Sequence, residues 1–71
     1  MGEIIKLGLA IHVDVYDKYG NMTRIEFNDK EGKHIIDAEW DPNDPQDSEH
    51  RIKFREWAYR LIEQKGYRIP K

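Results

Sequence analysis

The feature that most constrains the fold is an alternation of apolar residues near the N-terminus. From Ile5 to Val15 every odd-numbered position is apolar, whereas the even-numbered positions include His12 and Asp14. A period of two is typical of a β-strand with one buried face. We therefore expect a strand over about 4–16 whose odd-numbered side chains are buried.

Two glycine-containing turns divide the sequence that follows into further strands. The segment Lys18-Tyr19-Gly20 has the length and the glycine of a three-residue hairpin loop. A second turn ends at Gly32 and leads into another alternating segment. We expect strands at about 22–28 and 34–40, which completes a three-stranded antiparallel meander.

The first loop also predicts how the strands align. If Asp17 lies opposite Asn21, then Val13 lies opposite Ile25, and apolar residues face each other on one side of the sheet. On the other side, the same register predicts a ladder of alternating charges across the three strands. The expected ladder consists of Asp14, Arg24 and Asp37.

An amphipathic helix is expected after the sheet, over about 45–65. Five apolar residues recur at spacings of three and four and form one stripe. Asp44 is the preferred N-cap, with proline at the first helical position, while Asp47 or Ser48 would start the helix one turn later. The stripe consists of Phe54, Trp57, Ala58, Leu61 and Ile62.

These patterns predict one α+β domain over 1–71, a β-β-β meander with one C-terminal helix packed on one face. Gly66 ends the helix, and 67–71 is expected to be a flexible tail. With 71 residues and no cysteine, the chain depends on its hydrophobic core for stability. We expect no cofactor and no metal. No apolar run approaches the roughly 20 residues of a membrane span, so we expect a cytoplasmic protein without membrane contact.

The charges are separated along the chain. Residues 1–50 carry five Lys or Arg against twelve Asp or Glu, a net charge of −7, and 51–71 carry seven against two, a net charge of +5. A total of −2 therefore conceals a dipolar molecule whose basic part is the helix. This basic helix is the main indication of a functional surface, although the same charges also serve solubility.

Catalysis has little support in the sequence. Asp14 and Asp37 could hold a divalent cation on one sheet face, which leaves a metal-dependent hydrolase as a remote alternative. Arg24 is expected between them, however, where it neutralises the pair. No nucleophile motif is present, and we expect neither enzymatic activity nor a small-molecule substrate.

The residues expected to bind a partner lie mostly on the helix. Ile52 and Tyr59 lie off the apolar stripe, seven residues apart, and can form an exposed ridge flanked by charge; a tilted helix would bury Ile52 instead. The strand before Ile11 would extend past the second strand, so either a bend at Gly8, the C-terminal tail or a second subunit covers it. The expected partner-binding residues are Ile52, Lys53, Arg55, Tyr59 and Arg60, and those for self-association are Leu7 and Leu9.

The function that these patterns favour is a small non-enzymatic protein-interaction module. Its partner would be another protein, with a homodimer as one option, and the contact surface would be the exposed face of the helix. The alternative is a nucleic-acid-binding domain that uses the basic helix, although the acidic sheet would repel a polyanion. The residues of this alternative are Lys53, Arg60, Lys65 and Arg68.

Overall fold

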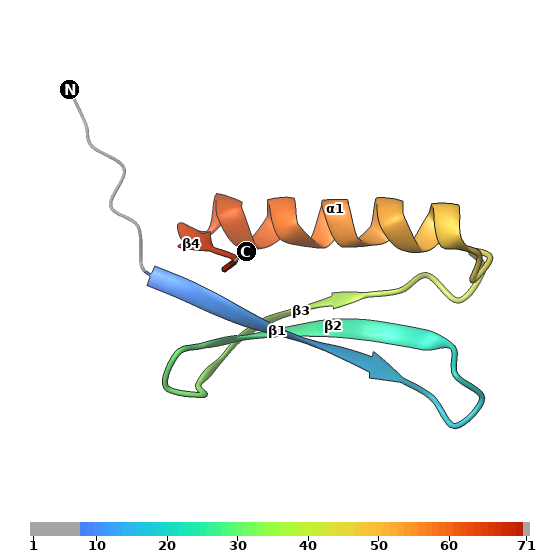
Figure 1. Cartoon of the computed structure of the whole chain (residues 1–71), viewed down its shortest axis with the longest axis horizontal. Helices are drawn as coiled ribbons and strands as arrows, with labels where there is room; N and C mark the ends of the chain where they lie inside the picture. Colours follow the sequence, from blue (N-terminus) through green and yellow to red (C-terminus); the bar gives the residue numbers. More distant parts are fainter. Residues whose placement is uncertain (1–7, 71) are drawn as a thin grey trace.

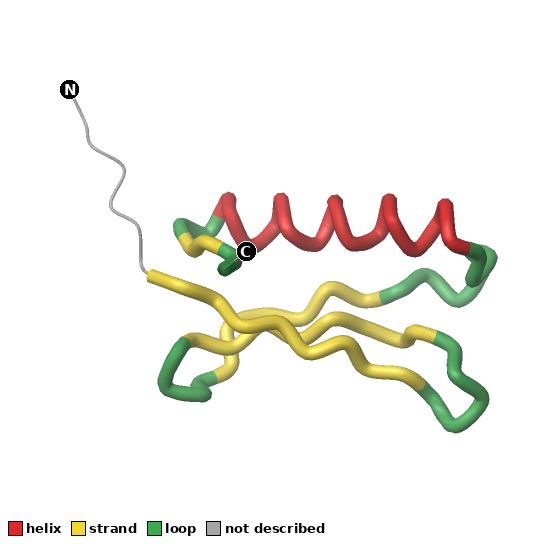
Figure 2. The backbone as a smooth tube through the Cα atoms, viewed as in Figure 1, coloured by secondary structure: helices red, strands yellow, loops and turns green. Residues whose placement is uncertain are grey.

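The computed structural model describes residues 8–70, which form a four-stranded sheet with one helix across one face (Figures 1 and 2). The strand order is β3-β2-β1-β4, with β1 to β3 antiparallel and β4 parallel to β1. The predicted α+β fold, three antiparallel strands followed by one helix, is confirmed. The elements are β1 (Gly8–Tyr16), β2 (Met22–Asp29), β3 (His34–Glu39), α1 (Ser48–Gln64) and β4 (Tyr67–Arg68).

The two hairpins use the same turn. Asp17 and Asp29 each precede a three-residue loop that ends in a glycine with positive φ, 84° at Gly20 and 87° at Gly32. Each aspartate also accepts two backbone N–H groups of its own turn through Oδ1, at 2.8 to 2.9 Å. The predicted loop at Lys18-Tyr19-Gly20 is confirmed, because backbone hydrogen bonds close it between Asp17 and Asn21.

The predicted strand register is wrong by one residue beyond this turn. Tyr16 pairs with Met22 but Val15 pairs with Arg24, so Thr23 is the extra residue of a β-bulge. The bulge reverses which side chains of the two strands share a face. Asp14, and not Val13, therefore lies opposite Ile25.

As a result, the even-numbered side chains of β1 from Ala10 to Asp14 face the helix, whereas Tyr16, on the other side of the bulge, is exposed. Ile25 and Phe27 of the central strand are fully buried under the helix, and the β1 residues opposite them share that side. Ala10 is fully buried, while Ile11 and Val13 point away from the helix and are 48% and 45% exposed. The expectation that the odd-numbered face is buried is therefore wrong.

The predicted charge ladder does not form, for the same reason. Asp14 lies on the helix side, where it accepts a hydrogen bond from Arg55. Arg24 lies on the other side, pairs with Glu39 across the strands and bonds Glu26 at 2.8 Å through Nε. Asp14 and Asp37 thus lie on opposite faces of the sheet.

The helix packs on the sheet through a narrow strip. Ala58 and Ile62 are fully buried, and the core between helix and sheet also contains Met22, Ile25, Phe27, Ala38 and Trp40. The N-cap is Asp47, whose carboxylate accepts the backbone N–H of His50 at 2.9 Å. The prediction of Asp44 as the N-cap is therefore wrong. The helix begins one turn later, with the alternative cap Asp47.

The segment before the helix is held against the sheet by a side-chain amide. Gln46 accepts the backbone N–H of Met22 and donates to its carbonyl, both at 3.0 Å. These two bonds reproduce the pairing of a strand, so the 40–47 loop follows the edge of the sheet before α1 starts.

The tail differs from the flexible segment that was expected. Gly66, with a φ of 97°, turns the chain back after the helix, and Tyr67–Arg68 pair in parallel with Gly8 and Leu9. Tyr67 and Ile69 pack against the core. Of the three ways considered for covering the start of β1, the pairing of the C-terminal tail is therefore the one observed.

Candidate functional site

The two flanks of α1 face opposite edges of the sheet. On one flank Arg55 binds Asp14, and the hydroxyl of Tyr59 lies 3.4 Å from Nε2 of His12, so this flank lies over β1. The other flank carries Phe54 and lies over the end of β3. The ring of Phe54 packs on that of Trp40, with centroids 4.8 Å apart.

The predicted ridge of Ile52 and Tyr59 is only half present. Seven residues turn a helix by about 700°, so the two positions differ by only about 20° and share a flank. Ile52 is 59% exposed, but Tyr59 is half-buried and its ring packs edge-on against Phe27 at 6.4 Å. Arg55 is likewise engaged by Asp14, so Ile52 is the apolar residue of this flank that stays available.

The four cations of the nucleic-acid alternative are exposed but do not form an uninterrupted surface. Lys53 lies 3.4 Å from Glu49, and Glu56 shares the outward face with Arg60. Lys65 is the C-cap residue, while Arg68 belongs to β4. The four cations are therefore not all on one face of the helix.

The residues expected for self-association fall at the start of the sheet. Leu9 is 38% exposed and pairs with Arg68 of β4. Leu7 lies outside the described residues.

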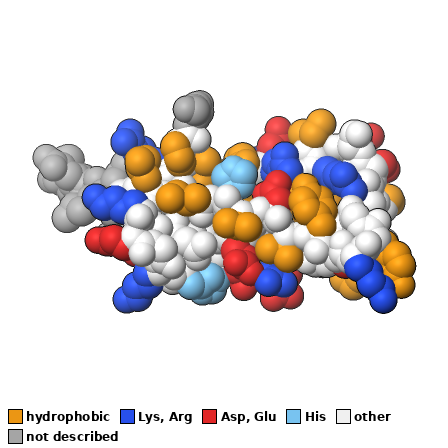
Figure 3. Space-filling view, turned by 60° about the horizontal axis from the view of Figure 1, so that its bottom comes forward, with side chains coloured by type: hydrophobic (Ala, Val, Ile, Leu, Met, Phe, Trp, Pro, Cys, Tyr) orange, Lys and Arg blue, Asp and Glu red, His pale blue; other side chains and the backbone are white. Residues whose placement is uncertain are grey.

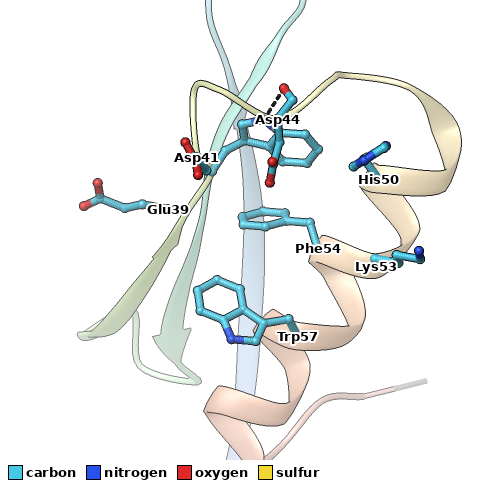
Figure 4. A pocket seen from close by; sticks show the side chains of 8 residues that line it. Glu39, Asp41, Asp44, His50, Lys53, Phe54 and Trp57 are labelled. Carbon is cyan, nitrogen blue, oxygen red and sulfur yellow. Dashed lines mark hydrogen bonds between the residues drawn. The ribbon is translucent and has the colours of Figure 1, made fainter.

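A concave, mainly apolar surface lies between α1 and the end of β3 (Figure 4). We call it the aromatic hollow, and its apolar wall consists of Trp40, Phe54 and Trp57. The rings of Phe54 and Trp57 lie 5.8 Å apart, and Trp57 is 43% exposed, whereas Trp40 is 7% exposed. The volume of about 360 Å³ falls within the range of ligand-binding clefts.

The rim of the hollow is predominantly acidic. Asp41 and Asp44 line it together with Lys53 and His50, whereas the carboxylate of Glu39 points away from the hollow (Figure 4). Lys53 faces Glu49, and among the described residues neither Asp41 nor Asp44 forms an ion pair. The rim therefore carries an excess of negative charge next to exposed aromatic carbon.

The end of the hollow nearest the start of α1 is fixed by the helix cap. Nδ1 of His50 lies 2.7 Å from Oδ1 of Asp47, which also accepts the His50 backbone N–H. That backbone bond, followed by the imidazole, lowers the pKa of Asp47 below its ordinary value. The indole N–H of Trp40 donates to the backbone carbonyl of Asp44 at 3.3 Å and holds the loop over the ring.

Within the described residues, no group of three or more His, Asp or Glu side chains lies close enough to hold a metal ion. The pair proposed for the remote hydrolase alternative, Asp14 and Asp37, is separated by the sheet. In the same part of the chain, no helix has the length and apolar character that crossing a membrane requires.

Trp57 is the residue of this site that the sequence pattern misassigned. It was placed in the buried stripe, yet it lies five residues from Ile62, about 140° around the helix. The sheet contacts a strip of the helix that is narrower than 140°. A residue at the border of the apolar stripe therefore stays exposed. The width of the stripe was the signal that could have identified it.

Comparison with protein-family models, with characterised proteins and with solved structures finds no match to this chain.

Proposed function

We propose that this protein is a small protein-interaction module that binds a segment of another protein in the aromatic hollow. The observation that carries the proposal is Trp57, a large aromatic side chain 43% exposed beside an apolar depression. Tryptophan is the residue most enriched among those that dominate binding energies, and such residues act where a neighbouring pocket excludes water.

The rim defines the chemistry of the partner segment. An apolar side chain would pack in the hollow against Phe54 and Trp57, and a neighbouring Lys or Arg would meet Asp41 or Asp44. A cation can also lie over the exposed indole of Trp57, where the ring quadrupole attracts it. The expected ligand is therefore an apolar residue flanked by basic residues.

The nucleic-acid alternative draws less support from the same surfaces. Of its four cations, Lys53 is next to Glu49, Lys65 is the C-cap residue and Arg68 lies in β4. The rim of the hollow is acidic and would repel phosphates. We therefore keep a single proposed function.

A displayed library of random peptides tests the proposal. The full chain is immobilised and bound peptides are sequenced after several rounds of selection. We expect enrichment of peptides in which an aromatic or aliphatic residue neighbours Lys or Arg. The affinity of a synthesised winner is then measured with the wild-type protein and with Trp57→Ser, which we expect to weaken binding at least tenfold.

The matched control is Ile52→Ser, which also removes an exposed apolar side chain from α1 but on the opposite flank. It should bind the same peptide with unchanged affinity. Circular dichroism establishes that both variants are folded. Recovery of acidic peptides, or equal affinity for the wild type and Trp57→Ser, would show that the hollow is not the binding site.

A further inference from the structure

One edge of β1 has no strand partner over most of its length. β2 pairs with β1 on one side, while on the other side β4 pairs only with Gly8 and Leu9. Within residues 8–70, the segment Ile11–Tyr16 therefore has an open edge, since Ala10 is fully buried. Such an edge presents backbone N–H and C=O groups to which another strand can bind.

The first hairpin determines which residues present these groups. The backbone N–H of Asp17 donates to the carbonyl of Asn21 at 2.8 Å, so Asp17 directs its backbone toward β2. Successive residues of a strand direct their backbone groups to opposite sides. The even-numbered residues of β1 therefore point theirs away from β2, and those on the open edge are His12, Asp14 and Tyr16.

The outer face of the same strand is apolar and exposed. Leu9, Ile11 and Val13 are 38%, 48% and 45% exposed, and no helix or strand of the described chain covers them. Figure 3 shows hydrophobic side chains on this side of the molecule among acidic and basic ones. An open edge combined with an exposed apolar face is the arrangement that strand pairing between molecules would bury.

We propose that a second copy of this chain pairs antiparallel with the open edge of β1, about a two-fold axis through Val13. The two sheets then become one continuous sheet. An interface of this kind uses the same surface on both subunits and is closed.

The side chains of β1 are complementary in this register. His12 lies opposite the partner's Asp14 on the helix side. On the outer face, Val13 lies opposite the partner's Val13 and Ile11 opposite the partner's Val15. An axis through Asp14 would instead place two carboxylates opposite each other, and like charges in that position are destabilising. Charge and apolar pattern therefore both favour Val13.

The two-fold axis also brings the helices together. It is perpendicular to the sheet, so both helices lie on the same face, and each turns toward the other the flank that lies over β1. This flank carries Ile52, 59% exposed, together with Arg55 and Tyr59. The aromatic hollow is on the opposite flank, so self-association and partner binding are separate and either proposal can fail alone.

The mass of the protein in solution is the first test. Light scattering at protein concentrations up to about 1 mM should give a mass of twice the 8.5 kDa of one chain. Val13→Lys places two ammonium groups against each other at the axis and should halve that mass while the circular dichroism stays unchanged. A wild-type mass of 8.5 kDa throughout, or an undiminished mass for Val13→Lys, overturns the proposal.

A cysteine scan tests the register, since the chain has no cysteine of its own. Residues facing each other in a non-hydrogen-bonded antiparallel pair have Cα atoms about 4.5 Å apart, within the span of a disulfide. Val13→Cys should therefore form a disulfide-linked dimer on mild oxidation. Ile11→Cys, equally exposed, lies about 13 Å along the strands from its copy and should stay monomeric on a non-reducing gel. Equal crosslinking of the two variants overturns the register.

Discussion

At the scale of single residues, aspartates stabilise the turns and the start of the helix by hydrogen bonds to the backbone. Asp17 and Asp29 accept backbone N–H groups in the hairpin turns, and Asp47 accepts one at the start of the helix. These N–H groups would otherwise lack a partner. Hydrogen bonds of this kind favour the ionised carboxylate. The backbone N–H of Asn21 is the largest influence that lowers the pKa of Asp17.

Because of these hydrogen bonds, the stability of the folded protein should decrease at acidic pH. A carboxyl whose pKa is lower in the folded than in the unfolded state stabilises the fold above its unfolded pKa, and the contribution disappears as the pH falls through the folded value. For Asp17 and Asp47 we therefore expect the melting temperature to fall as the pH drops below 3.8, the ordinary aspartate value.

The corresponding substitution is Asp17→Ala. It should lower the melting temperature by a few degrees at about pH 7, and by less at about pH 3, where the wild-type carboxylate is itself being protonated. Thermal unfolding followed by circular dichroism at both pH values measures this. Glu56→Ala, which removes an exposed helical carboxylate, should leave the pH profile unchanged; an equal effect of the two substitutions would rule out the turn bonds as the cause.

At the scale of elements, the helix is attached to the sheet by few contacts. Its buried residues are Ala58 and Ile62, and Phe54, Tyr59 and Leu61 pack around them. Short side chains of the sheet, Ala10 and Ala38, let the helix approach closely. A narrow contact of this kind leaves both flanks of α1 available for binding.

Two isoleucines of α1 test which face of the helix packs on the sheet. Ile62→Ala removes a fully buried side chain and should cost about 2–5 kcal/mol, a large part of the stability of a domain this small. Ile52→Ala, at a position 59% exposed, should change the free energy of unfolding by less than about 0.5 kcal/mol. Urea unfolding at equilibrium gives both values, and similar losses would mean that the helix packs in a different orientation.

At the scale of the whole molecule, the fold rearranges the charge asymmetry of the chain. The acidic N-terminal part supplies most of the sheet and the loops, and several of its carboxylates lie beside the helix: Asp14 binds Arg55, and Asp41 and Asp44 border the hollow. Cations that look concentrated along the sequence are therefore near acids in space. This reduces the attraction that the basic segment would otherwise exert on a polyanion.

We accordingly expect no specific binding of nucleic acid. In an NMR titration of the labelled protein with a short DNA duplex, the signals of Lys53, Arg60, Lys65 and Arg68 should move little at about 0.15 M salt. Shifts that are large at low salt and vanish steeply as salt increases would identify phosphate binding and revive the alternative. The same titration with heparin in place of the duplex is the control for binding by charge alone.

Local sequence patterns determined β1, β2, β3 and α1 and their order, but not β4. Both turns, the three strands and the helix follow from glycines, aspartates and the two apolar periods, because these act over a few residues. The inward direction of Ile25, Phe27 and Ala38 was also correct. Only the tertiary structure decided the face of β1, since one extra residue at Thr23 reverses every side chain beyond it. It likewise decided the site: Trp57 is exposed because the sheet contacts a strip of α1 narrower than the apolar stripe, a width that depends on packing and not on sequence spacing.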